Sequence, residues 1–137
     1  MPWVGPPPDV RRKVEDQLGD GIWEQLSQSW DRVAALDPQM RLTQWYRTPE
    51  QTVAERRRNP NAALYSQHAL GLAVDVTPTA ARRQAVIAEA RRRGFFVRTY
   101  RTDQHLHISA LSDPAWSRSA LQAHLRRLLA PLLARPR

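Results

Sequence analysis

Apolar residues recur at helical spacing over the first part of the chain. Val10, Val14 and Leu18 share one face of an expected helix that begins at Asp9 and ends before two glycines. A second apolar stripe follows, and its members are Trp23, Leu26, Trp30 and Val33. We therefore predict two helices, joined by a short turn, that form a helical hairpin.

The next segment predicts a short strand and then a capped helix. Residues 42–46 alternate between apolar and polar side chains and contain two aromatic residues, which favours a β-strand. Thr48 then precedes a proline, and Gln51 follows three residues after Thr48, as in a capping box. We expect this helix to run to about Arg58.

Three further strand-like runs surround another predicted helix. The strand candidates are residues 71–76, 95–100 and 105–109, and the last two lie close enough in sequence to form a hairpin. The helix between the first and second of these strands is expected to start at the Thr-Pro pair of residues 77–78. It should end at Gly94, because glycine is common just after the last turn of a helix.

A last helix is expected from Asp113 onward, with leucines on one face and arginines elsewhere. The order of elements predicts an α+β fold with a small antiparallel sheet and flanking helices. We divide it into an N-terminal helical segment (1–40), a core (41–111) and a basic amphipathic helix (112–137). Two interpretations of this helix remain open, packing on the domain and contact with an anionic envelope.

Length and charge restrict the class of protein. The chain has 137 residues, which allows one domain with a modest core. Its 21 basic and 13 acidic residues give a formal charge of +8, which favours anionic partners such as nucleic acid, anionic lipid or an acidic cell-wall polymer. No stretch approaches the roughly 18 apolar residues of a transmembrane segment. Residues 1–8 lack the features of a secretory signal peptide, so we expect synthesis in the cytoplasm.

The absence of cysteine excludes disulfides, thiolate zinc sites and iron–sulfur clusters. Any metal must then be held by histidine or by a carboxylate, and the chain has only four histidines. His105 and His107 would share a face of a strand, about 6.6 Å apart along the chain. Two histidines from among His68, His105 and His107, together with Asp75, could supply a candidate metal site of two imidazoles and one carboxylate.

Five residues around His68 and Asp75 match a known pattern, Ser-x-His-x-x-Gly-x-Ala-x-Asp. They are Ser66, His68, Gly71, Ala73 and Asp75. Here the sequence resembles the M15 group of zinc peptidases, the D-Ala-D-Ala carboxypeptidases and L-alanyl-D-glutamate endopeptidases of bacteria and phages. An upstream motif of that group, an aromatic residue, arginine and threonine before Glu-Gln, resembles residues 46–51. The resemblance covers residues 44–109 and implies the fold that this group shares with lysostaphin-type peptidases and the hedgehog domain.

The resemblance implies a role for each matching residue. His68, Asp75 and His107 would ligate Zn²⁺, and neutral imidazole and carboxylate suit that ion. Arg47 would bind the scissile carbonyl or its oxyanion. Ser66 would orient His68 or touch substrate, and Gly71 would let the backbone pass close to the metal.

The sequence departs from the family at two positions. The group often has an acidic general base three residues before its last zinc histidine, but Gln104 stands there and cannot accept a proton. We expect His105 to assist proton transfer, with Asp103 orienting it or serving as the base if the chain turns there. Trp45 stands where the family often has glycine before the aromatic-Arg pair.

The resulting prediction is a zinc metallopeptidase that hydrolyses peptidoglycan stem peptides, at a terminal D-Ala or inside the stem. The short chain favours an endopeptidase of phage-lysin type, a monomer that acts at the cell wall or in the periplasm once released. The alternative is a catalytically weak or inactive zinc-binding module that binds cell-wall peptide or a protein partner. Nucleic acid is a disfavoured partner, because both arginine triplets fall late in predicted helices, where solvated arginine is common.

Overall fold

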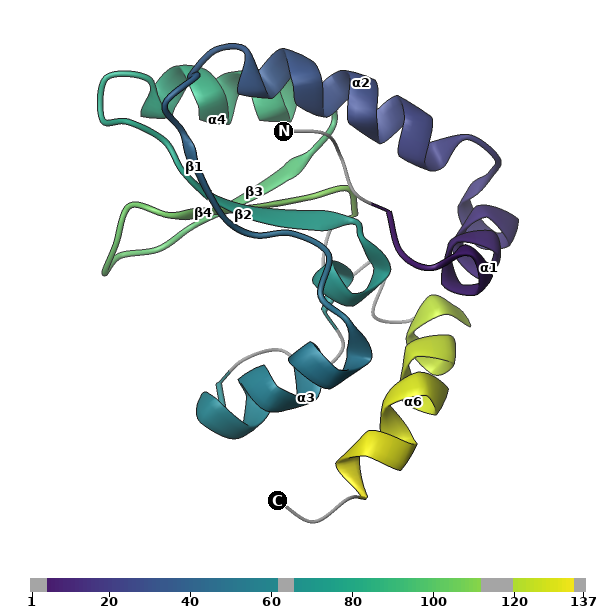
Figure 1. Cartoon of the computed structure of the whole chain (residues 1–137). Helices are drawn as coiled ribbons and strands as arrows, with labels where there is room; N and C mark the ends of the chain where they lie inside the picture. Colours follow the sequence, from purple (N-terminus) through teal and green to yellow (C-terminus); the bar gives the residue numbers. More distant parts are fainter. Residues whose placement is uncertain (1–4, 62–65, 112–119, 135–137) are drawn as a thin grey trace.

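The computed structural model describes residues 5–61, 66–111 and 120–134 (Figure 1). In chain order its elements are α1 (Pro8–Leu18), α2 (Ile22–Ala34), β1 (Arg41–Gln44), α3 (Pro49–Arg58), the 3₁₀ turn η1 (Gln67–Leu70), β2 (Ala73–Thr77), α4 (Arg83–Arg92), β3 (Phe96–Thr99), β4 (Leu106–Ser109) and α6 (Ala120–Leu133). This mixture of helices with a small sheet agrees with the predicted α+β class. No helix in the described ranges is both long and apolar enough to cross a membrane.

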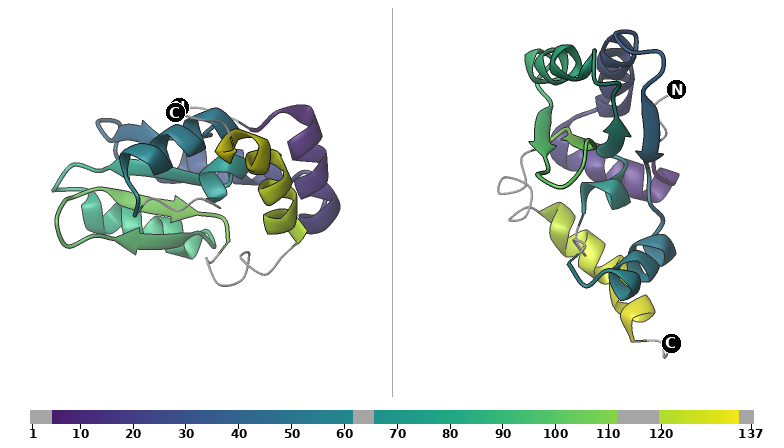
Figure 2. Two further views of the ribbon diagram at one scale, coloured as in Figure 1. Left: turned by 90° about the horizontal axis from the view of Figure 1, so that it is seen from below. Right: turned by 90° about the vertical axis from the view of Figure 1, so that its left-hand side faces the viewer.

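The four strands form one antiparallel sheet in the order β1-β2-β4-β3. The predicted hairpin of β3 and β4 is present at one edge, and β2 lies between β1 and β4 (Figure 2). The register of β2 and β4 pairs Asp75 with His107 and Val74 with Ile108. Two residues of the candidate metal site are therefore direct cross-strand neighbours.

The two faces of the sheet have different chemistry, because side chains alternate along each strand. On one face the residues are fully buried: Val74, Val76, Leu106 and Ile108. Helices α2 and α4 pack side by side over this face and add Trp30 and Val86 to the same core (Figure 1). The opposite face carries the polar residues of β2 and β4 and is left for a cleft.

The predicted helical hairpin at the N-terminus was wrong. Both helices form, but α1 packs against α6 and η1, whereas α2 packs against α4. Gly19 and Gly21, both with positive φ, lie in the turn between them. Apolar spacing indicates which face of a helix is buried, and it does not identify the element that covers that face.

Helix α6 packs against α3 and α1, and its residues Leu121 and Leu132 are buried. Arg57 of α3 also donates a hydrogen bond to the carbonyl oxygen of Leu132, at 3.5 Å. These contacts agree with packing on the domain, while envelope contact stays a prediction. The expected start of this helix at Asp113 lies outside the described residues.

Two predicted helix starts had different outcomes. The capping box of α3 is confirmed, since the Thr48 hydroxyl accepts the Gln51 N–H at 3.1 Å and the Gln51 side chain accepts the Thr48 N–H at 3.0 Å. Helix α4 begins at Arg83 instead of residue 77, so that prediction was wrong. The carboxylate of Asp37 accepts the backbone N–H and hydroxyl of Thr79 at 2.7 and 3.1 Å, a tertiary contact that holds the preceding turn.

Gly71 has a role other than those considered from sequence. It closes η1 with φ of +70°, and β2 begins two residues later. A Cβ at this position would lie 2.8 Å from Cδ of Pro6 and 3.3 Å from Nε1 of Trp23. The missing side chain therefore makes room for the N-terminal segment, while the close passage of the backbone by the metal stays a prediction.

Gly71→Ala should destabilise the protein more than Gly21→Ala, a matched control at φ of +76° with open space around it. Both changes put alanine in a left-handed conformation, but only the first also forces a contact with Pro6. We expect the free energy of unfolding to fall by about 1–3 kcal/mol more for Gly71→Ala. Urea denaturation would measure both losses. Equal losses would mean that Pro6 moves aside without cost.

Candidate metal centre and cleft

The candidate metal centre starts from the cross-strand pair of Asp75 and His107. Nδ1 of His107 lies 3.0 Å from Oδ1 of Asp75, and Nε2 of His68 lies 3.3 Å from Oδ2 of the same carboxylate. The ring centroids of His68 and His107 are 5.1 Å apart, with an angle of 72° between the ring planes. One carboxylate thus lies between two imidazoles that come from different parts of the chain.

The 3₁₀ turn η1 brings His68 to this pair. Ser66 caps the turn, because its hydroxyl oxygen accepts the backbone N–H of His68 at 3.2 Å. The ring Nδ1 of His68 lies 3.0 Å from the carbonyl oxygen of Trp45. A carbonyl oxygen can only accept, so Nδ1 carries a hydrogen toward Trp45, and Nε2 is the ring nitrogen that faces Asp75.

This group can hold a metal ion. His68, Asp75 and His107 each offer one ligand atom, and these atoms lie within 4.8 Å of one another. His68 is buried, whereas Asp75 and His107 are partly exposed toward the cleft. A site with three protein ligands and an open side is the arrangement of catalytic metal centres.

The charge state of Asp75 favours metal binding. Burial alone would raise the pKa of this carboxyl, but hydrogen bonds with His107 and His68 outweigh burial and hold its pKa well below the usual range. Asp75 is therefore a carboxylate at neutral pH, so this ligand need not lose a proton to bind a cation, while the imidazole nitrogens that face it must be free of hydrogen.

Arg47 lies beside the metal centre and is held by its backbone. Its N–H donates to the carbonyl oxygen of His68 at 3.0 Å, and the residue is only 8% exposed. Nε is buried without a hydrogen-bond partner among the described residues. Burial lowers the pKa of this guanidinium, while the charges of Asp75 and Glu55 favour its protonated form. The geometry thus keeps a buried cation available at the wall of the cleft.

The metal centre opens into a cleft of about 980 Å³, which is lined by residues of the polar face of the sheet and of α3. Its described lining residues include four arginines. Arg41 lies on β1, Arg47 follows β1, Arg58 lies on α3 and Arg98 lies on β3. The cleft is also lined by the carboxylates of Glu55, Asp75 and Asp103. Glu55 forms an ion pair with Arg58. The cleft therefore presents cationic groups on both sides of the metal centre.

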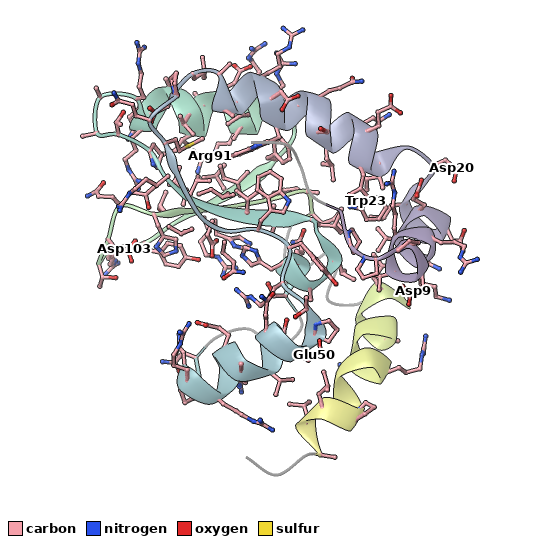
Figure 3. The ribbon with its side chains drawn as sticks, in the orientation of Figure 1. Asp9, Asp20, Trp23, Glu50, Arg91 and Asp103 are labelled. Carbon is pink, nitrogen blue, oxygen red and sulfur yellow. The ribbon has the colours of Figure 1, made fainter. Side chains whose placement is uncertain are left out.

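The chain turns just before the predicted strand of residues 105–109, as one of the two alternatives for Asp103 required. β4 begins only at Leu106, and the chain bends over residues 101–104, so Asp103 lies at the tip of the hairpin (Figure 3). Its carboxylate accepts the backbone N–H of His105 at 2.9 Å and also contacts Nδ1 of the His105 ring. The turn thus pairs Asp103 with His105, and both line the same cleft as His107.

Sequence reasoning missed two contributors to the site. Tyr100 stacks on His105, with ring centroids 4.1 Å apart and an angle of 21°. Trp45 contributes its carbonyl oxygen to His68, while its side chain packs edge-on against Trp30 in the core. The tryptophan at the family's glycine position therefore serves the core. A backbone carbonyl leaves no signal in a sequence, but an aromatic residue before the His-x-His pair was a signal for Tyr100.

No protein-family model, curated protein or solved structure matches this chain. Its function must therefore be argued from its own residues. They are two imidazoles and a carboxylate that converge, a buried arginine beside them, and an Asp–His pair in the same cleft.

Proposed function

We propose that this protein is a zinc-dependent peptidase that hydrolyses peptide bonds in the stem peptides of peptidoglycan. The observation that carries the proposal is the convergence of His68, Asp75 and His107 beside the buried guanidinium of Arg47. The resemblance of residues 44–109 to the M15 group supports the choice of reaction and substrate.

The donor set fits zinc. Two neutral imidazoles and one carboxylate are typical ligands of catalytic zinc, and the site contains no sulfur ligand that would favour a softer metal. Zinc bound there would acidify a water molecule and polarise the substrate carbonyl. The carbonyl oxygen of Trp45 holds His68 in the tautomer that leaves Nε2 free for the ion.

Arg47 binds the carbonyl oxygen of the scissile bond. Negative charge develops on this oxygen as the tetrahedral intermediate forms, and a preorganised guanidinium stabilises that charge. The backbone hydrogen bond to His68 and the burial of Arg47 hold this residue beside the metal centre before substrate binds.

His105 transfers the proton, with Asp103 as its orienting partner. Contact between Nδ1 and the Asp103 carboxylate leaves Nε2 of His105 to accept and return a proton in the cleft. The pKa of Asp103 is lowered, first by its hydrogen bond with the His105 backbone, so Asp103 remains an anion that stabilises protonated His105. This pair replaces the acidic general base that is missing at position 104.

The cleft suits an acidic peptide that passes through it. Arginines from β1, α3 and β3 lie on both sides of the metal centre, so carboxylates on either side of the scissile bond would find a cation. We therefore favour cleavage inside the stem over removal of a terminal D-Ala.

The zinc-loaded protein should release new amino termini from purified peptidoglycan. Chelation should abolish this release and added zinc should restore it, because the three protein ligands survive removal of the ion. Labelling of free amino groups, followed by mass spectrometry of the fragments, would identify the cleaved bond. Failure of the metal-loaded protein to release any amino termini would contradict the proposal.

The second candidate, a zinc-binding module without turnover, is favoured by Gln104 at the usual position of the base. The two functions differ in the effect of His105→Ala. In the peptidase this change should lower turnover by about 10²–10⁴-fold, the usual contribution of a general acid–base group. In a binding module it should leave the affinity for stem peptide unchanged, with no turnover in either protein.

A further inference from the structure

The loop that carries His105 is tied to a helix outside the cleft. Arg83, the first residue of α4, donates from Nη1 to the backbone carbonyl oxygen of Gln104 at 2.5 Å. Helix α4 covers the apolar face of the sheet, opposite the metal centre (Figure 1). Arg83 is not among the residues described as lining the cleft, so its role would not involve contact with substrate.

This bond acts on the peptide group next to His105. The carbonyl of Gln104 and the N–H of His105 belong to one planar peptide unit. Arg83 holds the carbonyl end of that unit, and the Asp103 carboxylate holds its N–H end at 2.9 Å. With both ends held, the orientation of the unit is set, and so is the position of the His105 Cα, which lies in the same plane.

The other described contacts of His105 are local. Asp103 and Tyr100 both lie within five residues of His105, in the same bent segment. Such contacts give the loop an internal shape, and they would move with it if the loop shifted as a unit. The Arg83 bond joins the loop to a helix of the core, 21 residues away in sequence.

We propose that Arg83 is a positioning residue for His105, acting through the carbonyl of Gln104. The expected effect of Arg83 on kcat rests on the proposed peptidase function, whereas its effect on the loop does not. The role uses only the backbone of residue 104. Gln104 therefore contributes to the site although its side chain cannot act as a base.

Arg83→Met tests the inference, because methionine keeps an apolar stem and removes every hydrogen-bond donor. Arg82→Met is the matched control, since Arg82 is exposed and has no described side-chain contact. Arg83→Lys restores a cationic donor. Backbone ¹⁵N order parameters of residues 103–105 should fall from about 0.85 to below about 0.6 in Arg83→Met. They should recover in part in Arg83→Lys and stay unchanged in Arg82→Met.

Kinetics on stem peptide provide the second measurement. Arg83→Met should lower kcat by about tenfold or more with KM nearly unchanged, because His105 is misplaced while the cleft is intact. Arg83→Lys should recover part of kcat. Unchanged order parameters together with unchanged kcat in Arg83→Met would overturn the inference. If the unmodified protein shows no turnover, the peptidase proposal fails, and the order parameters alone still decide whether Arg83 holds the loop.

Discussion

His68→Ala should remove the metal from the protein. We expect about one zinc ion per chain in the unmodified protein and almost none in the variant, because only two protein ligands remain. Loss of an outer partner of a metal ligand already costs about 10–100-fold in affinity, so loss of the ligand itself should cost more. His68 is also the ligand that η1 and the Trp45 carbonyl hold in place, so we expect no neighbouring group to substitute for it.

Elemental analysis of the dialysed protein would measure the zinc content, and competition with a chelator would measure the affinity. His124→Ala is the matched control, since His124 belongs to the sequence of α6 and is not one of the three proposed ligands. It should retain full zinc content. Zinc that persists in His68→Ala, or an unmodified protein that takes up no zinc, would refute the proposed metal centre.

Arg47→Lys should lower kcat by about 10²–10³-fold, the range found when one donor to an oxyanion is removed. Lysine keeps the positive charge and much of the volume at this buried position. It lacks the planar guanidinium whose several donors are fixed relative to one another. The zinc content should not change, because no ligand atom is altered.

The measurement is turnover of stem peptide together with zinc content and thermal stability of the same preparation. Arg82→Lys, the same substitution at an exposed position, should retain the unmodified rate. A variant of Arg47 that turns over at nearly the unmodified rate would exclude the guanidinium from stabilising the oxyanion. Loss of zinc in Arg47→Lys would instead make Arg47 a support of the metal centre.

Much of the fold could be predicted because local chain geometry determines it. The capping box of Thr48 and Gln51 depends on residues three apart, and the structure contains both of its hydrogen bonds. The alternation of Val74 and Val76 with Asp75 places the valines in the core and the carboxylate on the polar face. These patterns repeat with the period of the element, so a sequence records them directly.

Predictions failed where a distant segment of the chain decided which element covers a helix or where a helix begins. The two N-terminal helices formed as expected, but their packing partners lie up to about a hundred residues away on α6. The start of α4 was placed too early because Asp37, which holds Thr79, is 42 residues upstream. The close approach of Pro6, near the start of the chain, to Gly71 was not predicted from the sequence.

Residue identities alone predicted the chemical types at the site: two imidazoles, one carboxylate, an arginine and no sulfur. These types could be predicted because the ligand atoms are side-chain atoms, which the residue identities specify, and because spacing along a strand indicates which side chains share a face. Only the tertiary structure decided how the ligands are held, with the Trp45 carbonyl on His68, Asp103 turned onto His105, and Arg83 on the Gln104 carbonyl. These contacts use backbone atoms or a bend in the chain, and neither leaves a periodic pattern from which it could be predicted.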